Sequence, residues 1–102
     1  MRKKIVAGNW KMNMTTAEAA SLVTALKADL ANFREAEVVV CPPFTALATV
    51  SELVQGTHLD LGAQNMHWEK NGAYTGEISA GMLRELYCHY VILGHSERRQ
   101  YF

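Results

Sequence analysis

Apolar residues occur along this chain in short continuous runs, which alternate with stretches where apolar positions recur at helical spacing. The runs cover residues 5–7, 37–41, 59–64 and 90–93, and the turn-forming pair Gly8-Asn9 follows the first of them. The second run, from Glu37 to Cys41, is rich in β-branched residues and does not alternate with polar ones. Such a run is typical of a strand that is buried on both faces of a parallel sheet.

The stretches between these strands predict three helices. From Thr15 to Phe33 the apolar positions fall on one helical face, and Thr15 with Glu18 three residues later forms a capping box. We expect Thr45 to cap the second helix and Gly56 to end it. The third helix is short, follows a long polar stretch, and carries Met82, Leu83 and Leu86.

This βαβαβαβ order indicates a parallel sheet with helices outside it and right-handed crossovers. A closed eight-stranded barrel and an open doubly wound sheet both have this order, and the local pattern does not separate them. The last apolar run needs cover on both faces, yet the sequence stops at Phe102, about one helical turn after Ser96. We therefore expect the chain to be the amino-terminal part of a longer protein.

Composition narrows the class of protein. The 102 residues include 10 Lys and Arg against 10 Asp and Glu, so the chain lacks the basic excess of proteins that bind nucleic acid or acidic lipid. A hydrophobic share of 49% is enough for a folded core. No apolar run is long enough for a signal peptide or a membrane span. We therefore predict a cytoplasmic protein with no nucleic-acid and no membrane partner.

The two cysteines, Cys41 and Cys88, are too few for a disulfide framework. No cluster of Cys and His residues has the spacing of zinc ligands. We expect reduced thiols, as in a reducing compartment, and no metal site.

Polar residues of the types that act in binding and catalysis follow the predicted strands. They are Asn9 and Lys11 after the first strand, Gln64 and Asn65 after the third, and His95, Ser96 and Glu97 after the fourth. In parallel βα architectures these strand ends share one rim, where ligands bind. Because Asn9 and Lys11 are two residues apart, an extended backbone would place both side chains on one side, where an amide and an ammonium suit an oxyanion or a phosphate. The alternatives are a solvated surface lysine and a turn-forming asparagine.

His95 precedes Ser96 and Glu97, which have the pattern of a helix N-cap and a first-turn acid. A helix N-terminus disfavours the imidazolium form, and a neutral His95 is suited to donate a hydrogen bond to a carbonyl or enediolate oxygen; the alternative is an ordinary, partly buried histidine. The other histidines, at positions 58, 67 and 89, are expected to be structural or exposed.

Several common motifs fail in this chain. Residues 94–98 begin like the nucleophile elbow of serine hydrolases, but the bulky Arg98 stands where the motif needs glycine. No glycine-rich dinucleotide-binding turn follows a strand, and no P-loop occurs. Serine hydrolases, dinucleotide enzymes and P-loop proteins are therefore not supported.

Four longer motifs stand in order along the chain. They are Gly8-Asn9-Trp10-Lys11-Met12-Asn13, Gly62-Ala63-Gln64-Asn65, Gly72-Ala73-Tyr74-Thr75-Gly76-Glu77 and Gly94-His95-Ser96-Glu97-Arg98-Arg99. Their order and approximate spacing resemble the triose-phosphate isomerase family over essentially all 102 residues. The resemblance implies an α/β fold that is the amino-terminal part of a (β/α)8 TIM barrel, with about four strands and three helices. Residues 1–102 would then be the amino-terminal portion of one domain.

The resemblance also implies a homodimeric, cofactor-free isomerase of glycolysis and gluconeogenesis. It would interconvert dihydroxyacetone phosphate and D-glyceraldehyde 3-phosphate through an enediolate. The matching motifs assign substrate contact to Asn9 and Lys11, and catalytic roles to Lys11 and His95. A neutral catalytic histidine is a known property of this family, so that role of His95 is carried over from it. The motifs give Ser96 and Glu97 a supporting role, and Thr75 a place in the dimer interface.

The family's glutamate base, its lid and its later phosphate-binding loops would lie beyond Phe102, so the resemblance implies that these 102 residues alone are inactive. Glu77 and Glu97 are the nearest carboxylates by sequence, but the family gives neither the role of base. Two alternatives stay open: a standalone βα module that binds phosphate or assembles without catalysis, and another phosphate-binding barrel enzyme. A reading frame that continues into four more βα units, with a glutamate after the sixth strand, would favour the isomerase.

Overall fold

The computed structural model describes residues 4–95 and contains, in that range, four strands and three helices in βαβαβαβ order. Their bounds are β1 Ile5–Asn9, α1 Thr16–Asp29, β2 Glu37–Cys41, α2 Phe44–Val54, β3 Leu59–Ala63, α3 Ala80–Glu85 and β4 Tyr90–Val91. The predicted order of elements is therefore confirmed.

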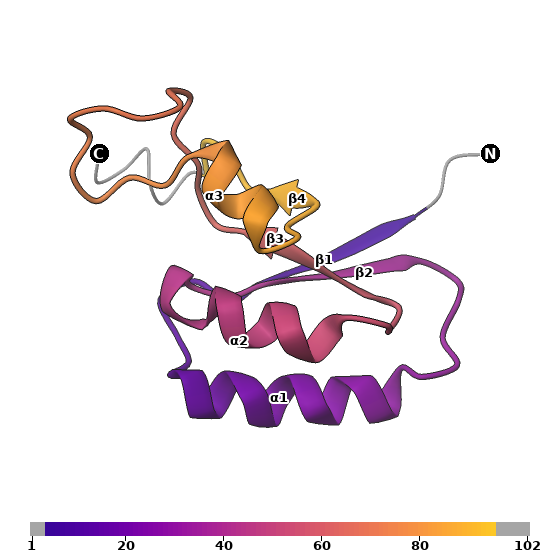
Figure 1. Cartoon of the computed structure of the whole chain (residues 1–102). Coiled ribbons are helices and arrows are strands. Elements are labelled where there is room, and N and C mark those ends of the chain that lie inside the picture. Colours follow the sequence, from indigo (N-terminus) through magenta and orange to yellow (C-terminus); the bar gives the residue numbers. More distant parts are fainter. Residues whose placement is uncertain (1–3, 96–102) are drawn as a thin grey trace.

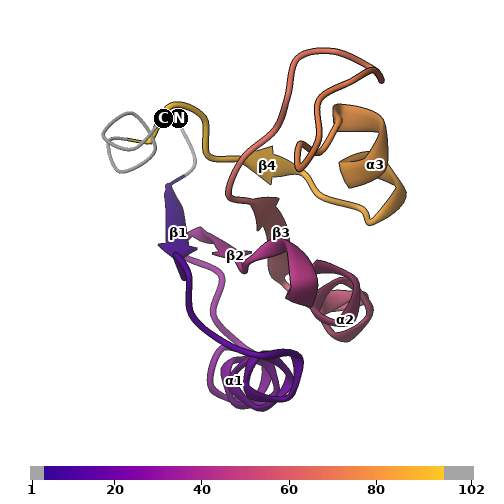
Figure 2. The same ribbon diagram turned by 90° about the vertical axis from the view of Figure 1, so that its left-hand side faces the viewer.

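All strand pairs are parallel, and the spatial order β1-β2-β3-β4 follows the chain. The sheet has four strands in this order, which is half of the eight that a closed (β/α)8 barrel would contain. The three helices lie on one side of the sheet (Figures 1 and 2). β1 and β4 form the two edges of this described sheet, and on β1 the side chains of Ile5 and Val6 are more than half exposed.

The core lies between the sheet and the helices. Alternate residues of β2 and β3, such as Val40 and Leu61, pack against buried residues of α1 and α2, such as Val23 and Val50. The intervening residues face the opposite side, which we call the inner face. At the carboxyl end of β2 both sets are buried, from Val39 at 1% exposed to Cys41 at 1%. The predicted two-sided burial of this strand is confirmed there.

The start of α1 follows the capping-box prediction. The side chain of Thr15 accepts a hydrogen bond from the backbone N–H of Glu18, and the Thr15 N–H donates to Glu18 Oε1 at 2.9 Å. The bond from the Thr15 N–H, followed by a side-chain hydrogen bond with Thr15, lowers the pKa of the Glu18 carboxyl. The helix ends at Asp29, so Phe33 belongs to the following turn. No helix among residues 4–95 has the length and apolar character needed to cross a membrane.

The predicted cap of α2 is wrong. The helix begins at Phe44, its N-cap is Pro43, and Thr45 already lies in the first turn. Proline supplies no side-chain cap, but its extended backbone at ψ 159° ends β2 and turns the chain into the helix. The predicted stop is confirmed, since α2 ends at Val54 and Gly56 has the left-handed φ of +75°.

Three strand ends differ from the predictions, and in β3 the strand ends at Ala63, one residue before the predicted Gln64. β1 continues through Gly8 and Asn9, which pair with β2 residues Val40 and Cys41, because the ladder to β2 overrides the turn preference of these two residues. β4 is shorter than the predicted run of residues 90–93, because only Tyr90 and Val91 pair with β3.

Candidate active site

Residues at or just after the carboxyl ends of all four strands line one open cleft with a volume of about 290 Å³. The lining residues are Asn9, Lys11, Met12, Pro43, Phe44, Gln64, Asn65 and His95. The structure therefore brings together the sequence-predicted Asn9, Lys11 and His95, although Asn9 ends β1, Lys11 follows it, and His95 follows β4.

Lys11 has an unusual backbone. Its φ is +57°, a left-handed conformation that residues other than glycine adopt rarely. Two side chains hold it: Asn9 Oδ1 accepts from the Lys11 N–H at 3.0 Å, and Gln64 Nε2 donates to the Lys11 carbonyl at 2.8 Å. The expected extended stretch from Asn9 to Lys11 is therefore wrong, because Asn9 uses its carboxamide oxygen to turn the chain.

Gln64 fixes the floor of the cleft. Its Nε2 also donates to the Cys41 carbonyl at 2.9 Å, and that carbonyl accepts from the Trp10 N–H at 3.2 Å. One amide group thus ties the loop after β1 to the carboxyl end of β2. The sequence analysis placed Gln64 on the rim but did not predict this role. A signal for it was present, because a polar amide stands directly after a buried strand.

The loop from residue 65 to residue 79 is closed at its base near the cleft. Asn65 Nδ2 donates to Glu77 Oε2 at 3.3 Å, and His67 Nδ1 lies 3.9 Å from the same oxygen. The His67 N–H donates to the Ile78 carbonyl at 2.7 Å. Glu77 therefore holds Asn65 in place at the edge of the cleft.

His67 has a structural setting, as the sequence suggested. Its ring stacks against those of Trp68 and Tyr74, with centroids 4.2 and 4.1 Å away. Beyond it the loop carries Thr75, which is exposed. The loop extends away from α1 and α2 (Figure 1).

His95 follows β4 and is half-buried in the cleft. Gly94 before it has φ +61°, a conformation that glycine adopts without strain and that turns the chain after the strand. Ser96 and Glu97, the residues expected to support His95, lie outside the described residues.

The chemistry of the cleft suits an anion. Among the described lining residues there are an ammonium, an imidazole and three carboxamides, but no carboxylate. Ammonium and amide groups bind phosphate and oxyanions through charge-assisted hydrogen bonds. Sequence reasoning did not anticipate Pro43 and Phe44 in this cleft, although their position directly after β2 places them at the same rim.

Other reactive groups of the described chain are unsuited to catalysis. Burial raises the pKa of the Cys41 thiol, and burial together with the nearby Cys41 raises the pKa of Cys88 to about 11. Both thiols therefore stay protonated at neutral pH and are poor nucleophiles. Within residues 4–95, no three His, Cys, Asp or Glu side chains gather in a way that could hold a metal ion.

Comparison with known proteins identifies the family. The sequence profile described as triosephosphate isomerase matches residues 4–102. This chain belongs to the triosephosphate isomerase family. Its four parallel strands and three helices match the amino-terminal part of a TIM barrel, so the closed barrel, and not the doubly wound sheet, is the correct alternative.

Individual members of the triosephosphate isomerase family are closely similar. The chain is 63% identical to the triosephosphate isomerase of Alkaliphilus oremlandii and 59% identical to that of Herpetosiphon aurantiacus, over 100% of this chain and 41% of each relative. The crystal structure of triosephosphate isomerase from Bartonella henselae superposes with a TM-score of 0.88 at 42% identity, covering 96% of this chain and 40% of that one. The chain thus spans about two-fifths of the length of the curated relatives it matches.

Proposed function

We propose that these residues form the amino-terminal portion of the single barrel domain of a triosephosphate isomerase. The enzyme interconverts dihydroxyacetone phosphate and D-glyceraldehyde 3-phosphate in glycolysis and gluconeogenesis. The observation that carries the proposal is the cleft in which Asn9, Lys11 and His95 meet, in a chain of this family.

In this proposal each cleft residue has a separate task. The Lys11 ammonium binds the substrate phosphate and balances the negative charge that develops on the enediolate, while Asn9 contributes substrate contact. Neutral His95 donates a hydrogen bond to the substrate oxygens as charge builds on them, which favours loss of the proton on the neighbouring carbon. No cofactor takes part. Ser96 and Glu97 keep the supporting role that their motif gives them.

The proton-abstracting base is a further requirement. Glu77, the nearest described carboxylate by sequence, is bonded to Asn65 and lies outside the set of residues that line the cleft. We therefore propose that the base belongs to the part of the relatives' length that these 102 residues do not span, and that the 102-residue chain alone is inactive.

We further propose a homodimer whose interface includes Thr75. The loop that carries it is long and exposes large apolar side chains, among them Trp68 at 80% and Tyr74 at 43%. Exposed aromatic side chains are enriched in protein interfaces.

A cytoplasmic location is supported by the free thiols of Cys41 and Cys88, which a reducing compartment preserves.

The proposal is tested in the full-length protein that carries these residues, with an enzyme-coupled assay for both triose phosphates. The wild-type protein is expected to be active. Lys11→Met should have a lower kcat and a higher KM, because one cation serves both the bound phosphate and the developing charge. Lys4→Met is the matched control, since Lys4 is exposed before β1, at the opposite end of the strand. Unchanged kcat/KM in Lys11→Met would remove Lys11 from the site. Turnover of a different sugar phosphate, with triose phosphates ignored, would refute the substrate.

A further inference from the structure

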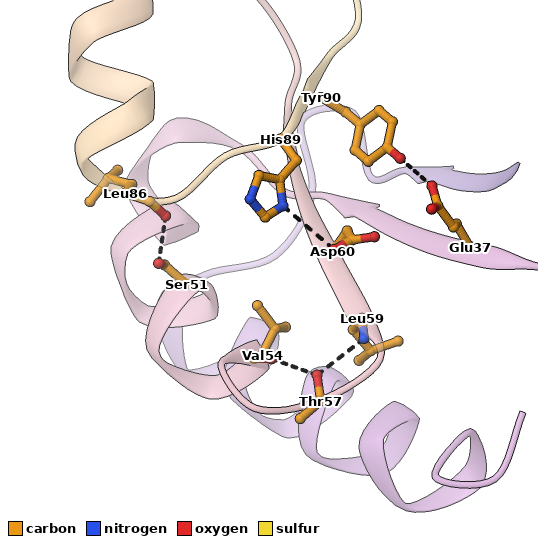
Figure 3. Close-up of polar contacts among 9 residues, drawn as sticks. All are labelled: Glu37, Ser51, Val54, Thr57, Leu59, Asp60, Leu86, His89 and Tyr90. Carbon is orange, nitrogen blue, oxygen red and sulfur yellow. Dashed lines mark hydrogen bonds and ion pairs between the residues drawn. The ribbon is translucent and has the colours of Figure 1, made fainter. Parts of the chain in front are cut away.

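A polar contact on the inner face of the sheet joins two strands that are not neighbours. The hydroxyl of Tyr90 on β4 donates a hydrogen bond to Oε2 of Glu37 on β2, and Figure 3 shows the two side chains pointing toward each other. β3 lies between β2 and β4, so this contact crosses a whole strand. Neither residue lines the cleft.

The middle strand has a glycine next to Tyr90, at a point where side chains of β2 also approach it. Gly62 is the register partner of Tyr90. A Cβ atom on Gly62 would lie 2.8 Å from Cys41 Sγ, 3.1 Å from Val39 Cγ1 and 3.4 Å from Tyr90 Cβ. Glycine in a strand often marks such a close approach of neighbouring groups. The bare backbone at Gly62 therefore allows side chains of β2 and β4 to approach across β3.

The surroundings keep Tyr90 in its donor form. The hydrogen bond to Glu37, followed by burial and by the negative charges of Glu37 and Asp60, raises the pKa of the Tyr90 hydroxyl. Asp60 Oδ1 itself lies 3.5 Å from Nδ1 of His89. Figure 3 draws this contact as a dashed line. At neutral pH the tyrosine is thus protonated and able to donate to the carboxylate.

Among the described strands, β4 pairs with β3 alone. The backbone bonds between this segment and β3 include those from the His89 N–H to the Leu61 carbonyl and from the Ile92 N–H to the Ala63 carbonyl, both 2.9 Å. The chain reaches His95 soon after Ile92. The placement of β4 therefore determines where the His95 imidazole enters the cleft.

β2 anchors the other side of the same cleft. The Cys41 carbonyl at its end accepts hydrogen bonds from the Trp10 N–H and from Gln64 Nε2, and Gln64 in turn holds the Lys11 carbonyl. A tie between β2 and β4 thus connects the strand that anchors Lys11 with the strand that leads to His95.

We propose that Tyr90 and Glu37 are positioning residues, whose hydrogen bond fixes β4 relative to β2 and so sets the place of His95 relative to Lys11. The proposal rests on the proposed isomerase function and adds two residues to it that touch no substrate. Catalysis by oriented groups is sensitive to displacements of about 1 Å, which can lower a rate about 100-fold. A small tilt of β4 therefore affects the chemical step more than phosphate binding.

The test uses the full-length protein. In Tyr90→Phe, which keeps the ring and removes the hydroxyl, kcat is expected to fall about tenfold while KM changes less than about twofold. Tyr87→Phe is the matched control, since Tyr87 is 64% exposed, and it should keep wild-type kcat. Glu37→Gln retains an oxygen acceptor for the phenol and should stay near wild type, whereas Glu37→Ala should resemble Tyr90→Phe. The double variant Tyr90→Phe with Glu37→Ala should lose no more than either single variant.

A second readout does not depend on turnover. The ¹⁵N chemical shifts of the His95 imidazole should change in Tyr90→Phe and stay at their wild-type values in Tyr87→Phe. Unchanged kcat in Tyr90→Phe, even with a lower Tm, would overturn the positioning role, as would an equal loss in Glu37→Gln. If the wild-type protein shows no isomerase activity, the proposed function fails, and the His95 shifts alone then decide whether the contact between Tyr90 and Glu37 positions that residue.

Discussion

At the scale of single residues, the site depends on a strained lysine and the amide that holds it. A left-handed backbone costs a residue such as Lys11 about 1–3 kcal/mol and persists only where its surroundings enforce it. Both backbone polar groups of Lys11 are bonded to side chains, the N–H to Asn9 and the carbonyl to Gln64. Asn9 and Gln64 therefore fix the backbone from which the Lys11 ammonium extends, and the two atoms that do so, Asn9 Oδ1 and Gln64 Nε2, are not required for contact with a ligand.

Gln64→Glu is predicted to destabilise the protein by about 1–3 kcal/mol at neutral pH, because a carboxylate would face two carbonyl oxygens that now accept from the amide. Denaturant unfolding measures the loss. Lowering the pH should recover part of it, since the introduced carboxyl group regains one donor when it is protonated. Gln55→Glu, at the exposed end of α2, is the control. A neutral effect of Gln64→Glu would mean that the two carbonyls do not depend on this donor.

At the scale of elements, the hydrophobic pattern predicted most of the fold for a physical reason. Val39 and Val40 are buried on opposite faces of β2, and such two-sided burial leaves an uninterrupted apolar run in the sequence. The identity of the residues with which a strand pairs leaves no comparable pattern in the local sequence. The extension of β1 through Asn9 depends on its ladder to Cys41, far away in the chain, so the turn preference of Gly8-Asn9 was misleading.

The candidate site was predictable in location but not in detail. The carboxyl ends of parallel strands meet at one rim, which is why Asn9, Lys11 and His95 could be grouped from the sequence. The contact of Gln64 with two carbonyls and that of Tyr90 with Glu37 join distant segments through side chains. Their geometry depends on sheet register, which the sequence pattern does not contain.

Gly62→Ala is predicted to destabilise the sheet by about 1–3 kcal/mol, because the added methyl would lie 2.8 Å from the buried Cys41 sulfur. Gly81→Ala in α3 is the matched control: the nearest atom to its Cβ is 3.9 Å away, and alanine favours the helix. Thermal unfolding of both variants gives the comparison. Equal Tm values would show that β2 and β4 yield easily around position 62.

The capping box of α1 predicts a dependence of stability on acid. Because the pKa of Glu18 is lowered in the folded chain, its contribution is present above the unfolded pKa and is lost as pH falls through the folded value. Between those two values, stability should fall with pH less in Glu18→Gln than in the wild type, since glutamine does not titrate. If the free energy of unfolding depended on pH in the same way in both proteins across that acid range, the stabilising role of the Glu18 carboxylate would be contradicted.

At the scale of the whole molecule, the four-stranded sheet leaves two strands at its edges and much of β1 exposed. Open edges and uncovered apolar faces favour association with further strands. The exposed loop around Thr75 is a second surface suited to a partner, in keeping with the proposed dimer.

Deletion of residues 71–76 in the full-length protein is predicted to give monomers with low activity, because the loop is longer than a connection requires and carries the proposed interface. Sedimentation reports the assembly state, and the coupled assay reports activity. A deletion variant that remains dimeric at low micromolar concentration would remove the interface role of this loop.

The most direct test of the whole account is the steady-state kinetics of His95→Gln in the full-length protein, beside the same substitution at the exposed His58. A hydrogen-bond donor that acts as charge develops on the substrate oxygens affects mainly the chemical step. The account predicts a large loss of kcat with little change in KM for His95→Gln, and wild-type kinetics for His58→Gln. Normal kcat with only a raised KM in His95→Gln would contradict it.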